Sequence, residues 1–123
     1  MFRLARKAGP SEPAPPAGAM GYQLETGSDL LVDPVDAASL HTVLTELART
    51  GDFFVVGDNA NSMCYIQGYT NDSGATWQME YQEGDLADHW ATEVAGGDVE
   101  RIVLTWMSTR DVRRDAVWTR TPL

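Results

Sequence analysis

The residue of this chain best placed for acid–base chemistry is His89, which closes the run Asp85-Leu86-Ala87-Asp88-His89. A carboxylate beside an imidazole can orient the ring as a general base. Neighbouring residues on a strand point to opposite faces, so Asp88 is poorly placed to orient His89. An enzyme would therefore need His89 and either Glu80 or Glu83 to converge in one cleft.

Other patterns that carry chemistry are missing from the sequence. No serine lies in a nucleophile-elbow context, and there is no glycine-rich phosphate loop. Cys64 has no nearby cation to lower its pKa, and His41 is expected on the surface of a helix. The oxygen-rich stretches 58–62 and 71–73 lack the ligand spacing of a calcium loop. The sequence thus predicts no catalytic residue, no metal site and no cofactor.

The charge of the chain is strongly negative, with a formal net charge of −9 at pH 7. Between Gly21 and Thr109, fifteen acidic residues stand against two basic ones, Arg49 and Arg101. A body of this charge repels phosphate backbones, so nucleic acid is not expected as a ligand. A basic protein partner would be steered toward it, which raises the association rate more than the affinity.

Composition divides the chain into residues 1–20 and a single domain over residues 21–123. The first part is basic and then Pro/Ala-rich, with prolines at 10, 13, 15 and 16. This composition predicts a disordered, extended leader rather than a secretory signal. No window approaches the twenty apolar residues of a membrane span, and one cysteine excludes an internal disulfide. We therefore expect no membrane contact and a cytoplasmic location.

Hydrophobic periodicity predicts elements in the order β-α-β-β-β-β-α-β. A strand at 22–26 precedes a helix at 34–50, with Asp33 as its N-cap. Strands are expected at 53–57, 63–70, 75–82 and 89–94, a second amphipathic helix after Asp98, and an edge strand at 116–121. The pattern predicts an α+β fold, an antiparallel meander sheet with two helices on one face.

Alternation within two strands predicts which side chains lie on the open face of that sheet. Residues 63–70 turn Cys64 and Ile66 toward the helices, and residues 75–82 turn Trp77 and Met79 the same way. The tyrosines on the other side suit a protein interface, although they could equally pack under loops or tail segments. Together with the adjacent acidic turn, the predicted partner-binding surface consists of Tyr65, Gln67, Tyr69, Gln78, Glu80, Gln82, Glu83, Asp85 and Asp88.

Three segments resemble the Imm1-type immunity proteins: Tyr65-Ile66-Gln67, residues 77–85 (WQMEYQEGD) and Asp88-His89-Trp90. The likeness covers roughly residues 22–121. The resemblance implies a small acidic α+β protein that binds a polymorphic toxin, often one that modifies nucleic acid, and so protects the producing cell. It implies no catalytic residues. Trp77 and Glu80 match the recurring Trp-x-x-Glu spacing of the family.

The sequence leaves three hypotheses for the function. The first is a cytosolic, non-enzymatic protein that neutralises a protein partner, as an immunity protein does. The second is a small-molecule sensor or regulatory domain, with a pocket between the open sheet face and the loops. The third is an enzyme that uses His89 with a carboxylate. An uncovered sheet face with aromatic side chains could also form a homodimer.

Overall fold

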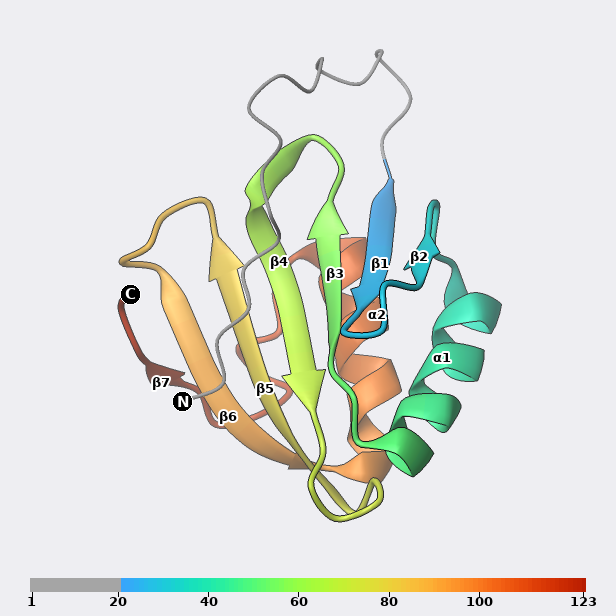
Figure 1. Cartoon of the computed structure of the whole chain (residues 1–123). Helices are drawn as coiled ribbons and strands as arrows, with labels where there is room; N and C mark the ends of the chain where they lie inside the picture. The colour runs from blue at the N-terminus through green and yellow to red at the C-terminus, as the bar shows by residue number, and fades with distance from the viewer. Residues whose placement is uncertain (1–20) are drawn as a thin grey trace.

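An antiparallel sheet of seven strands organises residues 21–123, the part of the chain that this computed structural model describes. Its strand order is β2-β1-β3-β4-β5-β6-β7. Both helices lie behind the sheet in Figure 1, and the opposite face carries no helix. The predicted α+β fold with an antiparallel sheet and two helices on one face is confirmed. The prediction of a disordered leader concerns residues 1–20, which lie outside the described residues.

The strands and helices follow the predicted order, with one addition, the two-residue strand β2. The strands are β1 (Tyr22–Thr26), β2 (Leu31–Val32), β3 (Phe54–Asp58), β4 (Asn61–Tyr69), β5 (Thr76–Glu83), β6 (His89–Ala95) and β7 (Thr119–Arg120). The helices are α1 (Ala37–Thr50) and α2 (Val99–Thr109), with a short 3-10 turn, η1 (Gly96–Asp98), before α2. The last edge strand is therefore shorter than the predicted 116–121.

Helix α1 begins three residues later than predicted, because Asp36 and not Asp33 is its N-cap. The Asp36 carboxylate accepts a hydrogen bond from the Ser39 amide, and the Ser39 hydroxyl accepts one from the Asp36 amide. Before this capping box, the Val35 amide donates to the carbonyl of Tyr22 in β1. That contact holds the segment against the sheet, and Pro34 stays outside the helix.

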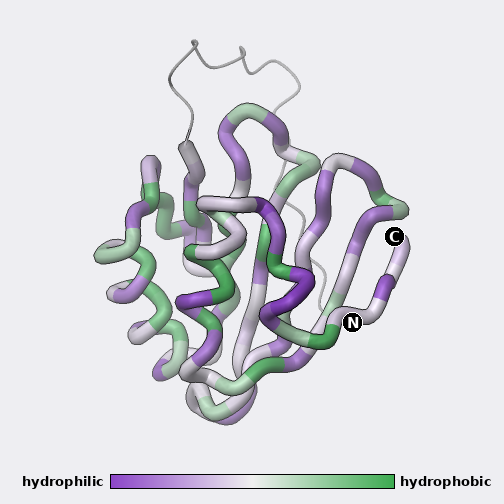
Figure 2. Tube along the Cα trace, turned by 180° about the vertical axis from the view of Figure 1, so that it is seen from behind, coloured by the Kyte–Doolittle hydropathy of each residue, from purple (hydrophilic) through white to green (hydrophobic). Residues whose placement is uncertain are grey.

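The hydrophobic core lies between the sheet and the two helices. Helix α1 contributes Leu40, Val43, Leu44 and Leu47, and helix α2 contributes Val99, Ile102, Val103 and Trp106. The strands contribute alternate residues, among them Phe54, Val56, Ile66, Trp77, Met79 and Tyr81. Seen from the helix side in Figure 2, hydrophobic and hydrophilic residues alternate along the helices, as expected for helices with one buried side.

A close backbone approach joins the β4–β5 turn to the start of η1. The Gly96 amide donates to the carbonyl of Ala75 at 2.9 Å. A Cβ atom added at Gly96 would lie 1.8 Å from the carbonyl oxygen of Gly74. At Gly97, the next residue, an added Cβ would meet nothing within 4 Å. Only glycine therefore fits at position 96 without a shift of the backbone.

We expect Gly96→Ala to lower the free energy of unfolding by at least about 2 kcal/mol, because the new methyl group would collide with a carbonyl that cannot move freely. Gly97→Ala is the matched control, and we expect it to change stability by less than about 1 kcal/mol. Urea denaturation followed by circular dichroism measures both. Equal stability of the two variants would contradict the packing of this turn.

Candidate functional site

Polar side chains from β4, β5 and β6 lie together on the sheet face that carries no helix. Strand register decides this, because Gln67 pairs with Glu80, and Gln82 pairs with both Tyr65 and His89. The Tyr65 hydroxyl donates to Oε1 of Gln82 at 3.3 Å, and the Gln82 amide donates to the carbonyl of Met63 at 3.1 Å. The sequence correctly placed these side chains opposite the helices.

Their exposure differs from the prediction. Gln67 and Gln82 are 1% exposed, Glu80 is 4% exposed, and Tyr65 is 1% exposed. The prediction that Glu80 and Gln82 form part of an exposed surface was therefore wrong. Strand alternation reports which face a side chain takes, but not whether that face is covered. These four residues cannot contact a partner protein in the conformation described here.

At the centre of this polar face, Glu80 and His89 form a close carboxyl–imidazole pair. Nε2 of His89 lies 2.9 Å from Oε1 of Glu80, and the two side chains are 1% and 6% exposed. Nδ1 of His89 lies 2.8 Å from the carbonyl oxygen of Thr121, so Nδ1 carries the proton of this hydrogen bond. In the neutral ring Nε2 is then an acceptor, and a protonated Glu80 is the form that can donate to it.

Burial shifts the pKa of both members of the pair. It raises the pKa of Glu80 to about 7, although a hydrogen bond from Gln67 acts in the opposite direction. Burial also lowers the pKa of His89 below its usual 6.5, against the effect of its bond to the Thr121 carbonyl. Both shifts favour the uncharged side chains, because the free-energy cost of removing a charge from water exceeds the stabilisation that the surrounding hydrogen bonds give to the charged form.

The enzyme hypothesis required His89 to converge with Glu80 or Glu83, and the structure brings it to Glu80. Neither His89 nor Glu80 lines either of the two cavities described below. Glu83 lies away from them, where its Oε1 accepts from Nε1 of Trp106 at 2.7 Å and from Nε of Arg110 at 3.1 Å. The pair has the chemistry of a base and its orienting acid, but both side chains are almost completely buried.

The remaining residues of the predicted surface are better placed to meet a partner. Tyr69 and Gln78 are half-buried, and the Gln78 amide donates to the exposed Glu93 carboxylate at 2.6 Å. Asp85 is exposed and Asp88 is half-buried. The structure thus separates the predicted surface into a buried part on the sheet face and an accessible part that continues into the β5–β6 turn.

The β5–β6 turn is acidic, and hydrogen bonds connect it within itself and to the C-terminal residue. The Asp85 carboxylate accepts from the Ala87 amide at 2.8 Å, and the Leu86 carbonyl accepts from the Leu123 amide at 3.0 Å. Leu86 is 50% exposed at the tip. Among residues 21–123, no basic side chain forms an ion pair with Asp85 or Asp88. The Asp88 carboxylate accepts a hydrogen bond from Nε1 of Trp90 at 2.6 Å.

A cavity of about 270 Å³ opens beside this turn, on the helix side of the sheet. Its aromatic walls are Tyr81 and Trp90, which pair across β5 and β6. The charged lining residues are Glu83, Asp88, Asp111, Arg110 and Arg113. Both arginines bond to carboxylates of this lining, which leaves the Asp88 carboxylate as the group without a counter-charge.

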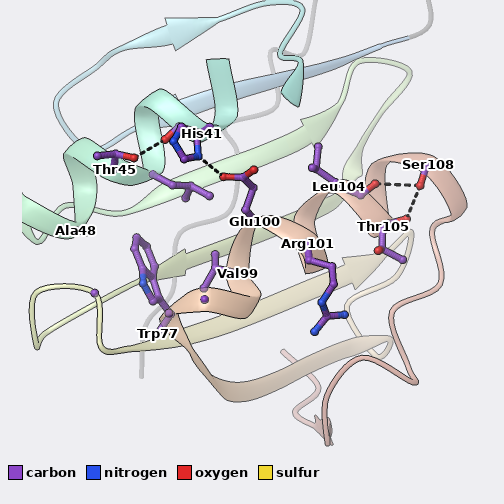
Figure 3. A pocket seen from close by; sticks show the side chains of 14 residues that line it. His41, Thr45, Ala48, Trp77, Val99, Glu100, Arg101, Leu104, Thr105 and Ser108 are labelled. Carbon is purple, nitrogen blue, oxygen red and sulfur yellow. Dashed lines mark hydrogen bonds and ion pairs between the residues drawn. The ribbon is translucent and has the colours of Figure 1, made fainter. Parts of the chain in front are cut away.

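A second and larger cavity, about 830 Å³ in volume, lies between α1 and α2 (Figure 3). Nδ1 of His41 lies 2.6 Å from Oε1 of Glu100 and so joins the two helices across it. Sequence reasoning placed a pocket on the other side of the molecule, between the open face and the loops, and did not identify this groove. The sequence pattern that could have indicated the groove is a second set of residues at helical spacing beside the apolar stripe of each helix. In α1 these residues are His41, Thr45 and Ala48, and in α2 they are Arg101, Leu104, Thr105 and Ser108.

Metal and thiol chemistry find little support in the described part of the chain. Within residues 21–123, no three His, Cys, Asp or Glu side chains gather as a metal site would require. Cys64 is buried, and burial raises the pKa of its thiol, so the reactive thiolate is disfavoured. No helix in residues 21–123 has the length and apolar character needed to cross a membrane.

In comparisons with known proteins, no family model, no curated protein and no solved structure matches this chain. The similarity to Imm1-type immunity proteins accordingly remains a hypothesis from short sequence motifs.

We expect Glu80→Gln to become more stable relative to the unmodified protein as the pH rises from about 4.5 to about 8. The folded protein keeps the Glu80 proton up to about pH 7, whereas the unfolded chain loses it near 4.5. The stabilisation by this proton is complete below 4.5 and lost as the pH rises through 7, with a total change on the order of 2–3 kcal/mol. Glutamine does not titrate, and His89 is present in both proteins.

Urea denaturation of both proteins at several pH values measures this difference. Glu93→Gln, which neutralises an exposed carboxylate on β6, is the matched control and should show no such trend. A stability difference between Glu80→Gln and the unmodified protein that does not vary with pH would show that Glu80 is ionised in the folded protein.

Proposed function

We propose that this protein is a non-enzymatic, cytoplasmic binding domain that neutralises a basic protein partner, as an immunity protein does its toxin. The observation that carries the proposal is the acidic β5–β6 turn, where Asp85 and Asp88 have no counter-ion among residues 21–123 and Leu86 is half exposed between them. A carboxylate pair around an apolar tip suits a basic surface with a shallow apolar depression.

The hydrogen bonds that hold the turn support a binding role. Hydrogen bonds from Leu123 to the Leu86 carbonyl and from Arg120 to the Ala87 carbonyl fix the turn against the C-terminal segment. A surface that is already in its bound conformation loses less conformational entropy on association. The turn therefore has the properties of a preorganised contact rather than of a loop that must fold on binding.

The adjacent cavity supports a basic partner in particular. Its volume of about 270 Å³ is enough for one arginine or lysine side chain, and Tyr81 and Trp90 offer aromatic surface to a cation. The Asp88 carboxylate, which forms no ion pair with residues 21–123, lies in the same lining. A toxin that acts on nucleic acid needs a basic cleft to hold its substrate, and an acidic surface of this kind would occupy that cleft.

We expect Asp85→Lys combined with Asp88→Lys to weaken binding of the partner by about 100-fold or more, mainly through a slower association rate. The partner is first isolated from host lysate with the unmodified protein, and the variants are then compared by surface plasmon resonance at two salt concentrations. The matched control combines Glu46→Lys with Asp98→Lys, which makes the same change of charge on α1 and η1, outside the β5–β6 turn. Equal weakening by both pairs would exclude the turn as the contact.

The groove between α1 and α2 favours a second function, the recognition of a small molecule. Its volume of about 830 Å³ is within the range of ligand pockets. The lining combines apolar side chains, among them Leu44, Trp77 and Leu104, with hydroxyl groups of Thr45, Thr105 and Ser108. Figure 3 shows His41 and Glu100 bridging the two helices beside it.

If the groove binds a metabolite, the compound should raise the melting temperature of the protein, and Thr45→Trp should abolish that rise by filling the groove. Thr42→Trp is the matched control, because Thr42 is also an exposed α1 residue whose hydroxyl donates to a backbone carbonyl, but it does not line the groove. Screening a metabolite collection by differential scanning fluorimetry tests this. A thermal shift that survives in Thr45→Trp would place the ligand elsewhere.

A further inference from the structure

The four tryptophans of the chain differ in what their indole N–H groups bind. The indole N–H groups of Trp90, Trp106 and Trp118 each donate to an acceptor, at distances of 2.6 to 2.9 Å. Trp77 is only 3% exposed, yet no residue in the described part of the chain accepts a hydrogen bond from its Nε1. A buried indole N–H normally has an acceptor, because leaving it unpaired costs free energy. The donor of Trp77 is therefore available to a ligand.

Nε1 of Trp77 opens onto the groove between α1 and α2, which Trp77 lines together with Gly74 and Ala48. A Cβ atom added at Gly74 would lie 2.9 Å from Cβ of Ala48 and 3.9 Å from Nε1 of Trp77. The missing side chain at Gly74 thus leaves the space beside this N–H unfilled. Nε1 is also accessible, because it does not belong to the side-chain atoms of residues 21–123 that are fully enclosed without a partner.

The charged side chains that line the groove are already paired. Nδ1 of His41 lies 2.6 Å from Oε1 of Glu100, and Arg101 forms ion pairs with Asp98 at 3.3 Å and with Asp115 at 2.6 Å. A charged ligand would have to compete with one of these pairs or lose its hydration without a counter-charge. An uncharged ligand is therefore the one that this lining fits.

Two hydroxyl groups of the lining are bonded to the backbone of their own helices. The Thr45 hydroxyl donates to the carbonyl of His41 at 2.8 Å, and the Ser108 hydroxyl donates to the carbonyl of Leu104 at 3.0 Å. A hydroxyl that donates within its helix does not offer the same hydrogen to a ligand. The indole N–H of Trp77 is not committed in this way.

We propose that the groove binds an uncharged, mainly apolar small molecule that carries an oxygen acceptor, such as a ketone or an ester, and that Nε1 of Trp77 donates to this oxygen. The inference rests on the small-molecule function proposed above for the groove and adds the chemical class of its ligand. The apolar part of the ligand lies along Leu44, Ala48 and Leu104, and its oxygen lies at the Gly74 end of the groove.

Hydrogen exchange of the indole N–H groups tests the premise without a ligand. Heteronuclear NMR gives one indole cross-peak for each tryptophan, and Trp77→Phe identifies that of Trp77. We expect the indole hydrogen of Trp77 to exchange with water at least about tenfold faster than those of Trp106 and Trp118, which have acceptors. Exchange at Trp77 as slow as at Trp106 would overturn the proposal, because the N–H would then be closed off within the protein.

Acetophenone and ethylbenzene are matched probes of the ligand class, because they share a phenyl ring and a two-carbon chain and differ in the carbonyl oxygen. Each is titrated into the unmodified protein and into Trp77→Phe, and the shifts of groove cross-peaks give the dissociation constants. We expect Trp77→Phe to weaken acetophenone about fivefold more than ethylbenzene, which is the effect of one hydrogen bond. Benzoate, the charged analogue, should bind the unmodified protein at least about tenfold more weakly than acetophenone.

Equal weakening of both neutral probes would overturn the proposal, as would benzoate binding as tightly as acetophenone. Circular dichroism checks that Trp77→Phe is folded. If it is not, movement of the Trp77 indole cross-peak on addition of acetophenone to the unmodified protein supports the proposal, and an unmoved cross-peak overturns it. Absence of binding by both neutral probes would overturn this ligand class. A metabolite whose thermal shift is lost in Thr45→Trp would still support the function proposed for the groove, so the two failures are distinguishable.

Discussion

The side chain of Arg110 joins more of this structure than any other single group described above. The residue ends α2 in the left-handed conformation, with φ of 61°, so its side chain returns over the last turn of the helix. Its guanidinium bonds to Tyr22 of β1, Asp58 of β3 and Glu83 of β5, and lies 4.7 Å from the ring centroid of Trp106. One planar cation thereby connects three strands to the helix that covers them.

This connection also determines the electrostatics of one end of the molecule. Because Arg110 neutralises Asp58 and Glu83, neither of these two carboxylates adds to the uncompensated negative charge of the neighbouring β5–β6 turn. Glu83 additionally accepts a hydrogen bond from Trp106 on the helix side of the sheet, whereas His89 lies on the opposite face. The acidic turn and the buried Glu80–His89 pair are consequently two separate sites, although they are neighbours in the sequence.

The two faces of the sheet use different physical principles. The face toward the helices is apolar and close-packed, and it needs no specific pairing of polar atoms. The other face buries a carboxyl, an imidazole and two amides, and such groups are stable only when their hydrogen bonds are satisfied.

The sequence by itself determined the fold class, the order of the elements and the faces taken by the residues of β4 and β5, since these depend on local periodicity. It also located the acidic turn at 83–88. The N-cap of α1 was misplaced by three residues, because the bond from Val35 to Tyr22 joins segments far apart in the chain. The tertiary structure alone decided that Glu80 and Gln82 are buried, that His89 meets Glu80 rather than Glu83, and that a groove separates the helices. All three features depend on how elements far apart in the sequence are placed relative to one another. The hydrophobic periods of a strand (two residues) and of a helix (3.6 residues) do not encode that placement.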